Sequence, residues 1–225
     1  MPIRKIIITP GEYYHLCNRS NDKQNIFIED RDWIRFLFII LYFQSTENFN
    51  NLSRLITHFV KHRVFNIPRD KTEKIIKNRD VELIIFCLMP NHFHLLVRQL
   101  KEKGVSRYMQ RVQNAYAKYF NAKYKKSGHL FQGPFRIAHV KNNEQMLYLS
   151  AYIHRNCREL KHWQNKECQY PWSSFQDYCG KNRWGKLLEH NIISDQFPSP
   201  KDYKKFIDAS GAKLKSELDE NTQLE

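Results

Sequence analysis

The chain has 225 residues and carries 37 Lys and Arg against 23 Asp and Glu, which gives a formal net charge of +14. This length fits one sizeable core with extensions, and the basic excess favours a polyanionic partner, nucleic acid before membrane. The most apolar run, residues 33–43, is interrupted by Arg35 and is about half of the roughly 20 residues that a membrane span needs. With no signal-peptide core at the N-terminus, the sequence predicts a cytoplasmic protein that does not contact a membrane.

The five cysteines include no Cys-x-x-Cys pair, and their odd number indicates a reducing compartment. Cys157, Cys168 and Cys179 follow one another at intervals of eleven residues, with His154 and His162 nearby. This spacing is too loose to indicate zinc by itself, so we interpret these cysteines as structural thiols. A zinc-stabilised structural module is therefore only a third functional hypothesis.

The first elements predict a strand followed by a buried helix. Residues 13–19 alternate as a strand, and a polar turn follows at residues 20–25. Asp30 is placed to cap a helix over residues 31–43, whose dense apolar residues require burial against a sheet. Residues 44–80 are polar and charged and are interpreted as an insertion. Its two histidines, His58 and His62, share a helix face that we interpret as solvated, because no third metal ligand is visible.

Residues 81–97, VELIIFCLMPNHFHLLV, predict a β-hairpin whose strands meet at Met89-Pro90-Asn91. Side chains alternate along a strand, so His92 and His94 share one side and the apolar residues Phe93 and Leu95 point to the other. We expect the apolar side to anchor the strand and the histidine side to present its imidazoles to the candidate site. Two histidines at this spacing can converge on one metal ion, although such a pair is more often incidental.

Residues 101–124 predict a helix in the most basic part of the chain. Between residues 98 and 126, nine Lys and Arg stand against Glu102 alone, a net charge of +8. Four tyrosines lie between them, a mixture suited to following phosphates and stacking on unpaired bases. A solvated face above a tyrosine-rich core is the alternative, and the residues alone leave both open.

The last predicted elements of the core are a strand and a helix. Residues 129–140 form an apolar and basic strand with a Gly-Pro break, and Asn142 or Asn143 caps the helix that follows. This helix carries Tyr152 and Asn156, which emerge on one face one turn apart. A packing tyrosine and a capping asparagine are the ordinary alternatives.

Several segments resemble a known family. MPNHFHLLV is similar to the histidine-hydrophobic-histidine signature of the HUH endonucleases, in particular of the single-tyrosine transposases, which include the REP-associated tyrosine transposases. Further blocks resemble the family in the same order, and together they span about residues 11–178. These blocks are GEYYHLCNRSNDKQNIF, GHLFQGPFRIAHV, LSAYIHRNC and YPWSSF.

The order of elements and the resemblance together imply an α+β fold, a ferredoxin-like antiparallel sheet with helices packed on one face, plus a C-terminal helical extension. We predict a transposase domain over residues 1–178, with the insertion at residues 44–80. Residues 179–225 form the predicted extension.

The resemblance implies a metal-dependent endonuclease and strand transferase that acts on single-stranded DNA near hairpins and forms a covalent 5′-phosphotyrosine. Tyr152 would be the nucleophile, and His92, His94 and Asn156 would hold Mg²⁺ or Mn²⁺, although these ligands do not exclude zinc. Many relatives have proline where this chain has Cys157, so the helix is expected to continue past Asn156. The resemblance leaves open whether a homodimer completes the active sites in trans.

The partner implied is single-stranded or hairpin DNA. The alternative hypothesis is a regulator of the same fold that binds nucleic-acid hairpins without cutting them. The candidate DNA-binding residues are Arg98, Arg107, Arg111, Lys118, Lys123, Lys125, Lys126 and Arg136.

Overall fold

Four strands form one antiparallel sheet in the computed structural model, which describes residues 7–47, 52–65 and 68–212. Helix α1 (Asp30–Tyr42) follows the first strand, and α4 (Gly104–Tyr124) joins the third strand to the fourth. The strand order is β2-β3-β1-β4, which is the ferredoxin-like β-α-β-β-α-β arrangement. The strands are β1 (Tyr13–Arg19), β2 (Val81–Met89), β3 (His92–Gln99) and β4 (Arg136–Val140). The predicted α+β class and hairpin are confirmed.

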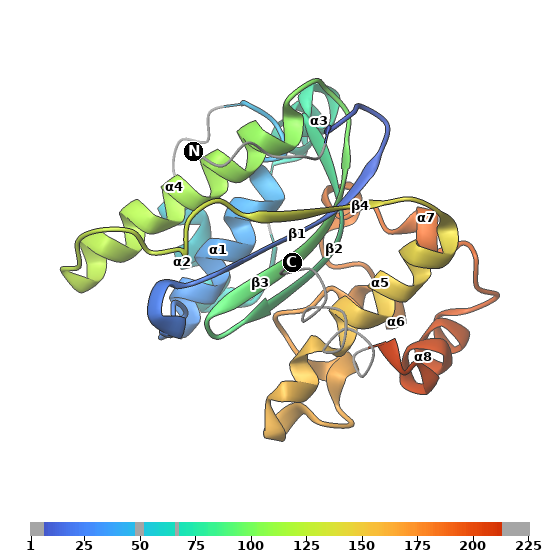
Figure 1. The fold of residues 1–225 in the computed structure, drawn as a ribbon. Coiled ribbons are helices and arrows are strands. Elements are labelled where there is room, and N and C mark those ends of the chain that lie inside the picture. Colours follow the sequence, from blue (N-terminus) through green and yellow to red (C-terminus); the bar gives the residue numbers. More distant parts are fainter. Residues whose placement is uncertain (1–6, 48–51, 66–67, 213–225) are drawn as a thin grey trace, which may run out of the picture.

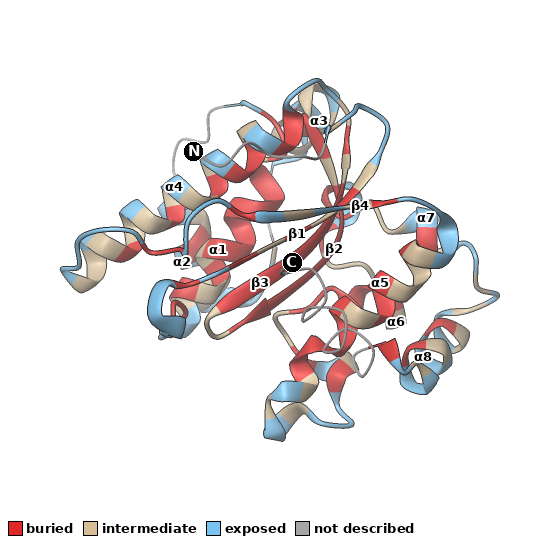
Figure 2. Ribbon diagram, viewed as in Figure 1, coloured by how far each residue is buried: buried red, intermediate tan, exposed pale blue. Residues whose placement is uncertain are grey.

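Helices lie on both faces of this sheet (Figure 1). On one face, α1 and α4 cover Leu16, Phe93 and Leu95 in a large apolar core, as predicted. On the other face, α5 (Asn143–Arg155) covers Leu96 and Cys87 in a second core. Strands β2 and β3 are therefore buried along most of their length, whereas β1 alternates between buried and partly exposed residues and only Val140 of β4 is buried (Figure 2). The helix after β4 thus packs on the histidine side of β3, and the helices are not confined to one face of the sheet as the sequence predicts.

The remaining elements surround this frame. No helix in the described ranges is long and apolar enough to cross a membrane. Short 3-10 turns follow β1 and α5 and recur in the C-terminal third. The other α-helices are α2 (Leu52–His62), α3 (Arg69–Asn78), α6 (Phe175–Cys179), α7 (Asn191–Ser194) and α8 (Pro200–Ala209). The 3-10 turns are η1 (Asn21–Lys23), η2 (Asn156–Glu159), η3 (Lys161–Trp163), η4 (Glu167–Gln169) and η5 (Gly185–Leu187).

The C-terminal third of the chain covers the outer edge of β2. The backbone N–H groups of Ser174 and Glu189 donate to the carbonyls of Phe86 and Leu83, at 2.9 and 2.8 Å. The N–H of Leu88 donates to Trp172 at 2.9 Å. An exposed strand edge is prone to pair with other chains, and these bonds remove that hazard at β2.

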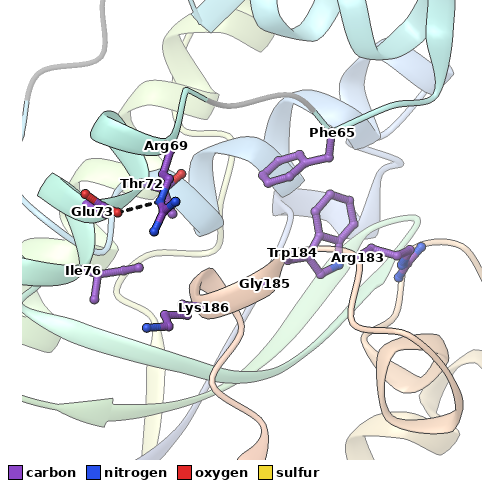
Figure 3. A pocket seen from close by; sticks show the side chains of 9 residues that line it. All are labelled: Phe65, Arg69, Thr72, Glu73, Ile76, Arg183, Trp184, Gly185 and Lys186. Atoms are coloured by element: carbon purple, nitrogen blue, oxygen red, sulfur yellow. Dashed lines mark hydrogen bonds and ion pairs between the residues drawn. The ribbon is translucent and has the colours of Figure 1, made fainter.

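The predicted insertion and the predicted extension contact each other. The rings of Phe65 and Trp184 meet edge to face at 4.8 Å, and a guanidinium N–H of Arg79 donates to the carbonyl of Lys186. A cavity of about 320 Å³ lies between α3 and η5 at this contact (Figure 3). The segment after residue 178 thus supplies buried side chains, and the boundary at that residue stays a prediction.

The signals expected at the element boundaries agree with the structure only in part. Glu29, not Asp30, is the N-cap of α1, and its N–H donates to the Asp32 carboxylate at 3.1 Å, because that carboxylate reaches back over the first turn. The last strand begins only at Arg136, after Gly133 at φ +103° turns the chain. Asn142 is the N-cap of α5 as predicted, accepting from the N–H of Gln145 at 2.8 Å.

Candidate active site

The two histidines of β3 point away from the core that α1 and α4 cover. Strand alternation fixes this direction, since Phe93 and Leu95 pack in that core and Leu96 in the other. His92 and His94 are 5% and 6% exposed, and their rings meet edge to face with centroids 5.2 Å apart. Each imidazole is therefore a buried polar group that needs a hydrogen-bond partner.

Each histidine uses its Nδ1 for such a contact. His92 Nδ1 lies 2.7 Å from Asn91 Oδ1, and His94 Nδ1 lies 2.9 Å from His15 Nε2 on β1. The contact with Asn91 requires a proton on His92 Nδ1, which leaves Nε2 of a neutral ring as the electron-pair donor. When His94 Nδ1 donates to His15, the electron pair of the neutral ring is likewise on Nε2. Hydrogen bonds of this kind, made by the ring nitrogen that does not bind the ion, orient the histidines of protein metal sites.

Strand β1 adds two residues to this face that sequence reasoning missed. Cys17 stands directly opposite His94, and the His15 ring stacks on the His94 ring at 5.2 Å with an interplanar angle of 10°. Burial lowers the pKa of His15 to about 4, so its ring is neutral at neutral pH. The alternation of Tyr13, His15 and Cys17 was visible in the sequence, but the identity of the neighbouring strand was not.

Helix α5 brings Tyr152 over the same rings. The Tyr152 ring lies edge to face on His94 at 5.5 Å and on His15 at 6.0 Å. Tyr152 is half-buried, whereas the residues on either side of it are buried. The structure thus brings Tyr152 into contact with His94, whose ring in turn meets that of His92.

Contacts next to Tyr152 fix the position of α5. His154 is fully buried, with Nε2 3.0 Å from Ser174 Oγ and Nδ1 2.8 Å from the Tyr203 hydroxyl. Burial lowers the pKa of His154 to about 3, so the neutral ring donates one of these hydrogen bonds and accepts the other. The helix is therefore tied to α8 and to the residue preceding α6.

Asn156 lies at the end of α5 and is buried. Its Nδ2 donates to the backbone carbonyl of Tyr152 at 2.9 Å, one turn earlier. The chain continues beyond it as the 3-10 turn η2 to Glu159, in line with Cys157 replacing a proline. An amide oxygen together with two imidazoles would make a donor set that fits Mn²⁺, and Mg²⁺ less closely.

Tyr116, the nearest alternative nucleophile in the sequence, lies on the other face of the sheet. Its hydroxyl donates to the carbonyl of Ile26 at 2.6 Å, and the residue is fully buried among aromatic rings of α1 and α4. Burial raises the pKa of Tyr116 far above its usual value. The sheet separates this phenol from both histidines.

The predicted DNA-binding residues divide into two groups. Arg107 and Arg111 pair with the buried carboxylate of Asp80, at 3.2 and 3.5 Å. Lys123 pairs with Asp32, which is fully buried, at 2.6 Å. The positive charges of these three residues therefore neutralise buried carboxylates of the protein itself.

Of the other basic candidates, four are exposed, whereas Arg98 is half-buried and pairs with Glu82 at 3.7 Å. Lys118, Lys125 and Lys126 are exposed on the last turns of α4 and just after it, and Arg136 is exposed on β4 opposite Cys17. Arg98 donates to the carbonyl of Gly11 at 3.1 Å and lies over the Tyr13 ring. Fewer of the candidate DNA-binding residues are thus accessible to a phosphate than the sequence predicts.

Beyond the histidine face, the described histidines and cysteines form no group of three that could share an ion. Among the described residues, the His, Cys, Asp and Glu groups close enough to share an ion are His15, Cys17 and His94. The five cysteines form no disulfide. The cavity in Figure 3 contains none of the predicted site residues either.

Comparisons with known proteins bear on the family and the fold of this chain. A family model described as "Transposase IS200 like" matches residues 51–156, which include both histidines, Tyr152 and Asn156. A solved structure, described as a REP-associated tyrosine transposase bound to a REP hairpin, aligns with a TM-score of 0.52 and 13% identity, over 80% of this chain and 87% of that one. This likeness supports the fold. No curated protein matches the sequence.

The first testable prediction concerns Lys123. Burial alone would raise the pKa of Asp32, but hydrogen bonds from Lys123 and two tyrosines lower it below its usual value. Removing the ammonium in Lys123→Met should therefore reduce the free energy of unfolding by about 1–3 kcal/mol, measured by denaturant titration. It should also move acid unfolding to higher pH, because the pKa of Asp32 rises. Lys118→Met, on the exposed side of α4, is the control and should change neither quantity.

Proposed function

Because the chain belongs to the IS200-like transposase family, we propose that it cuts and rejoins single-stranded DNA through a covalent bond to Tyr152. The observation that carries this proposal is the edge-to-face contact of the Tyr152 ring with His94, at 5.5 Å. It supports a nucleophile next to a metal ligand, which is the arrangement that phosphoryl transfer to a phenol requires. The burial of Tyr116 on the opposite face supports the same assignment.

The residues proposed to hold Mg²⁺ or Mn²⁺ are His92, His94 and Asn156. When bound, such an ion polarises the scissile phosphate and stabilises the charge that develops on it. Asn91 and His15 hold the two imidazole rings in orientation through their Nδ1 atoms. Because the histidine face is covered by α5, the reacting groups work in a largely dry setting in which such electrostatic effects are stronger.

The proposed step is a transesterification. The Tyr152 oxygen attacks phosphorus, the bond from phosphorus to the 3′ oxygen breaks, and the phenolic proton is transferred in net terms to the departing 3′ oxygen. The products are a 5′-phosphotyrosine and a free 3′-OH, so no water is consumed and the bond energy is retained for rejoining. A phenol with a pKa of about 10 suits this role, because a nearby cation favours the phenolate.

The proposed substrate contains a hairpin. The structurally similar transposase is described as bound to a REP hairpin, and this chain presents exposed lysines beside the fold that the two proteins share. Lys118, Lys125 and Lys126 are available for phosphate contacts, since they are exposed. A hairpin-binding regulator that does not cut DNA is the second hypothesis, and the covalent adduct distinguishes the two.

We expect Tyr152→Phe to abolish the covalent adduct with labelled single-stranded hairpin DNA and to retain hairpin binding, because only the attacking oxygen is removed. The readouts are denaturing gels for the adduct and fluorescence anisotropy for binding. Tyr116→Phe is the matched control and should still form the adduct, while losing about 1–3 kcal/mol of stability as the Ile26 carbonyl loses its donor. An adduct mapped to Tyr116 by mass spectrometry would contradict the assignment.

A further prediction concerns the metal. His92→Gln should lose cleavage in Mg²⁺ and Mn²⁺ and largely keep hairpin binding, because the amide removes one imidazole ligand without creating a large cavity. Chelation of the wild type should have the same effect. Thermal melting checks that the variant is folded. Normal cleavage by a folded His92→Gln protein would remove His92 from the ligand set.

The exposed lysines should contribute to affinity without contributing to chemistry. Replacing Lys118, Lys125 and Lys126 together by Gln should weaken hairpin binding and reduce the slope of log affinity against log salt by roughly one unit for each phosphate that the variant no longer binds. The charge-matched control replaces the exposed Lys166, Lys201 and Lys205 of the C-terminal third. Equal slopes for the two triple variants would place the DNA elsewhere on the protein.

A further inference from the structure

A row of side chains crosses the sheet on its histidine face. The strand register places Cys87 opposite His94, His94 opposite Cys17, and Cys17 opposite Arg136. Directly opposed residues of antiparallel strands share a face, with Cβ atoms about 4.5–5.5 Å apart. His94 is therefore flanked by two thiols, and Cys17 is the thiol on the same strand as His15.

His15, Cys17 and His94 already have nearly the spacing of the ligands in a metal centre. The ligand atoms of His15, Cys17 and His94 all lie within 4.8 Å of one another, and His15 Nε2 is 2.9 Å from His94 Nδ1. In a tetrahedral zinc site, bonds of 2.0–2.3 Å set the ligand atoms about 3.3–3.8 Å apart. Small side-chain rotations would close this difference, because the sheet holds the backbone of both strands in place.

The donor types select the ion. A thiolate with two imidazoles is a set that zinc prefers, whereas Mg²⁺ prefers oxygen ligands and binds such a set poorly. Binding replaces the thiol proton of Cys17, which is released to solvent. The Mg²⁺ or Mn²⁺ ligand set proposed above lacks a thiol, so the two sets differ in chemistry and share only His94.

We propose that His15, Cys17 and His94 form a zinc-binding site separate from the ligand set that serves DNA cleavage. A neutral imidazole has one electron-pair donor nitrogen, so His94 can bind one ion at a time. Zinc bound through His15 and Cys17 therefore withdraws His94 from His92 and Asn156. Inhibition of cleavage by zinc follows from this competition and rests on the proposed function. The binding of zinc does not depend on the proposed function.

The test uses Co²⁺ as a spectroscopic substitute for zinc, with the full chain under reducing conditions. We expect about one equivalent of Co²⁺ to produce the thiolate-to-cobalt charge-transfer absorption and the intense visible bands of tetrahedral cobalt, which zinc then displaces. Cys17→Ser should lose the charge-transfer band. Its zinc affinity, measured by competition with a chelating dye, should fall by more than the roughly 10- to 100-fold that removal of an outer contact costs.

Matched variants make the result specific. Cys87→Ser removes the thiol on the opposite side of His94, and Cys168→Ser removes one distant from the site in sequence; both should keep the band. His92→Gln should also keep it, although it is expected to lose cleavage. Thermal melting confirms that each variant is folded. Persistence of the band in folded Cys17→Ser, or its loss in folded Cys87→Ser, would overturn the site.

Cleavage assays then separate this inference from the proposed function. Zinc should inhibit Mn²⁺-dependent adduct formation in the wild type and should inhibit Cys17→Ser at least about tenfold less strongly. Equal inhibition of both proteins would overturn the competition for His94. A wild type that binds cobalt through Cys17 and forms no adduct under any condition would overturn the proposed function and leave the zinc site supported.

Discussion

Burial of two imidazoles between a sheet and a helix is the constraint on which this structure depends. A buried ring nitrogen without a partner costs free energy, so His92 and His94 each need an outer contact, and Asn91 and His15 provide them. A neutral ring that donates through Nδ1 carries its electron pair on the other nitrogen, and the Tyr152 ring lies against that of His94. The requirements of folding and the geometry proposed for the chemistry are therefore met by the same four polar side chains, and neither can change without the other.

The charge of the chain is also organised by burial. Two of the buried carboxylates, those of Asp32 and Asp80, are 0% and 2% exposed. Each would be strongly destabilising without a cation, and Lys123 and Arg107 supply it. Such pairs cancel in the sum, so the formal net charge of +14 is carried by the other residues. Exposed basic residues occur at the end of α4 (Lys118, Lys125, Lys126) and on β4 (Arg136), and also in the C-terminal third (Lys166, Lys201, Lys205).

Much of this arrangement could be predicted from sequence, and the failures have specific causes. Two-residue alternation in β3 correctly separated His92 and His94 from the apolar core residues, because that period depends only on local geometry. The role of β1 could not be predicted in the same way, since the pairing of Cys17 with His94 depends on a register set across 77 residues of sequence. From the sequence, Lys123 is a DNA-binding candidate, because its buried partner, Asp32, lies 91 residues away and the pairing cannot be seen locally.

The bonds that close the β2 edge have a consequence for how the protein is made. The last of them joins Leu83 to Glu189, which is synthesised more than a hundred residues later. At the usual 5–20 residues per second, that edge stays open on the ribosome for about 5–20 seconds. Ser174 and Tyr203, whose hydroxyl groups form the hydrogen bonds with His154 of α5, also lie in this late segment. In a nascent chain, the hydrogen bond between Tyr203 and His154 on α5 can therefore form only well after all four sheet strands have been synthesised.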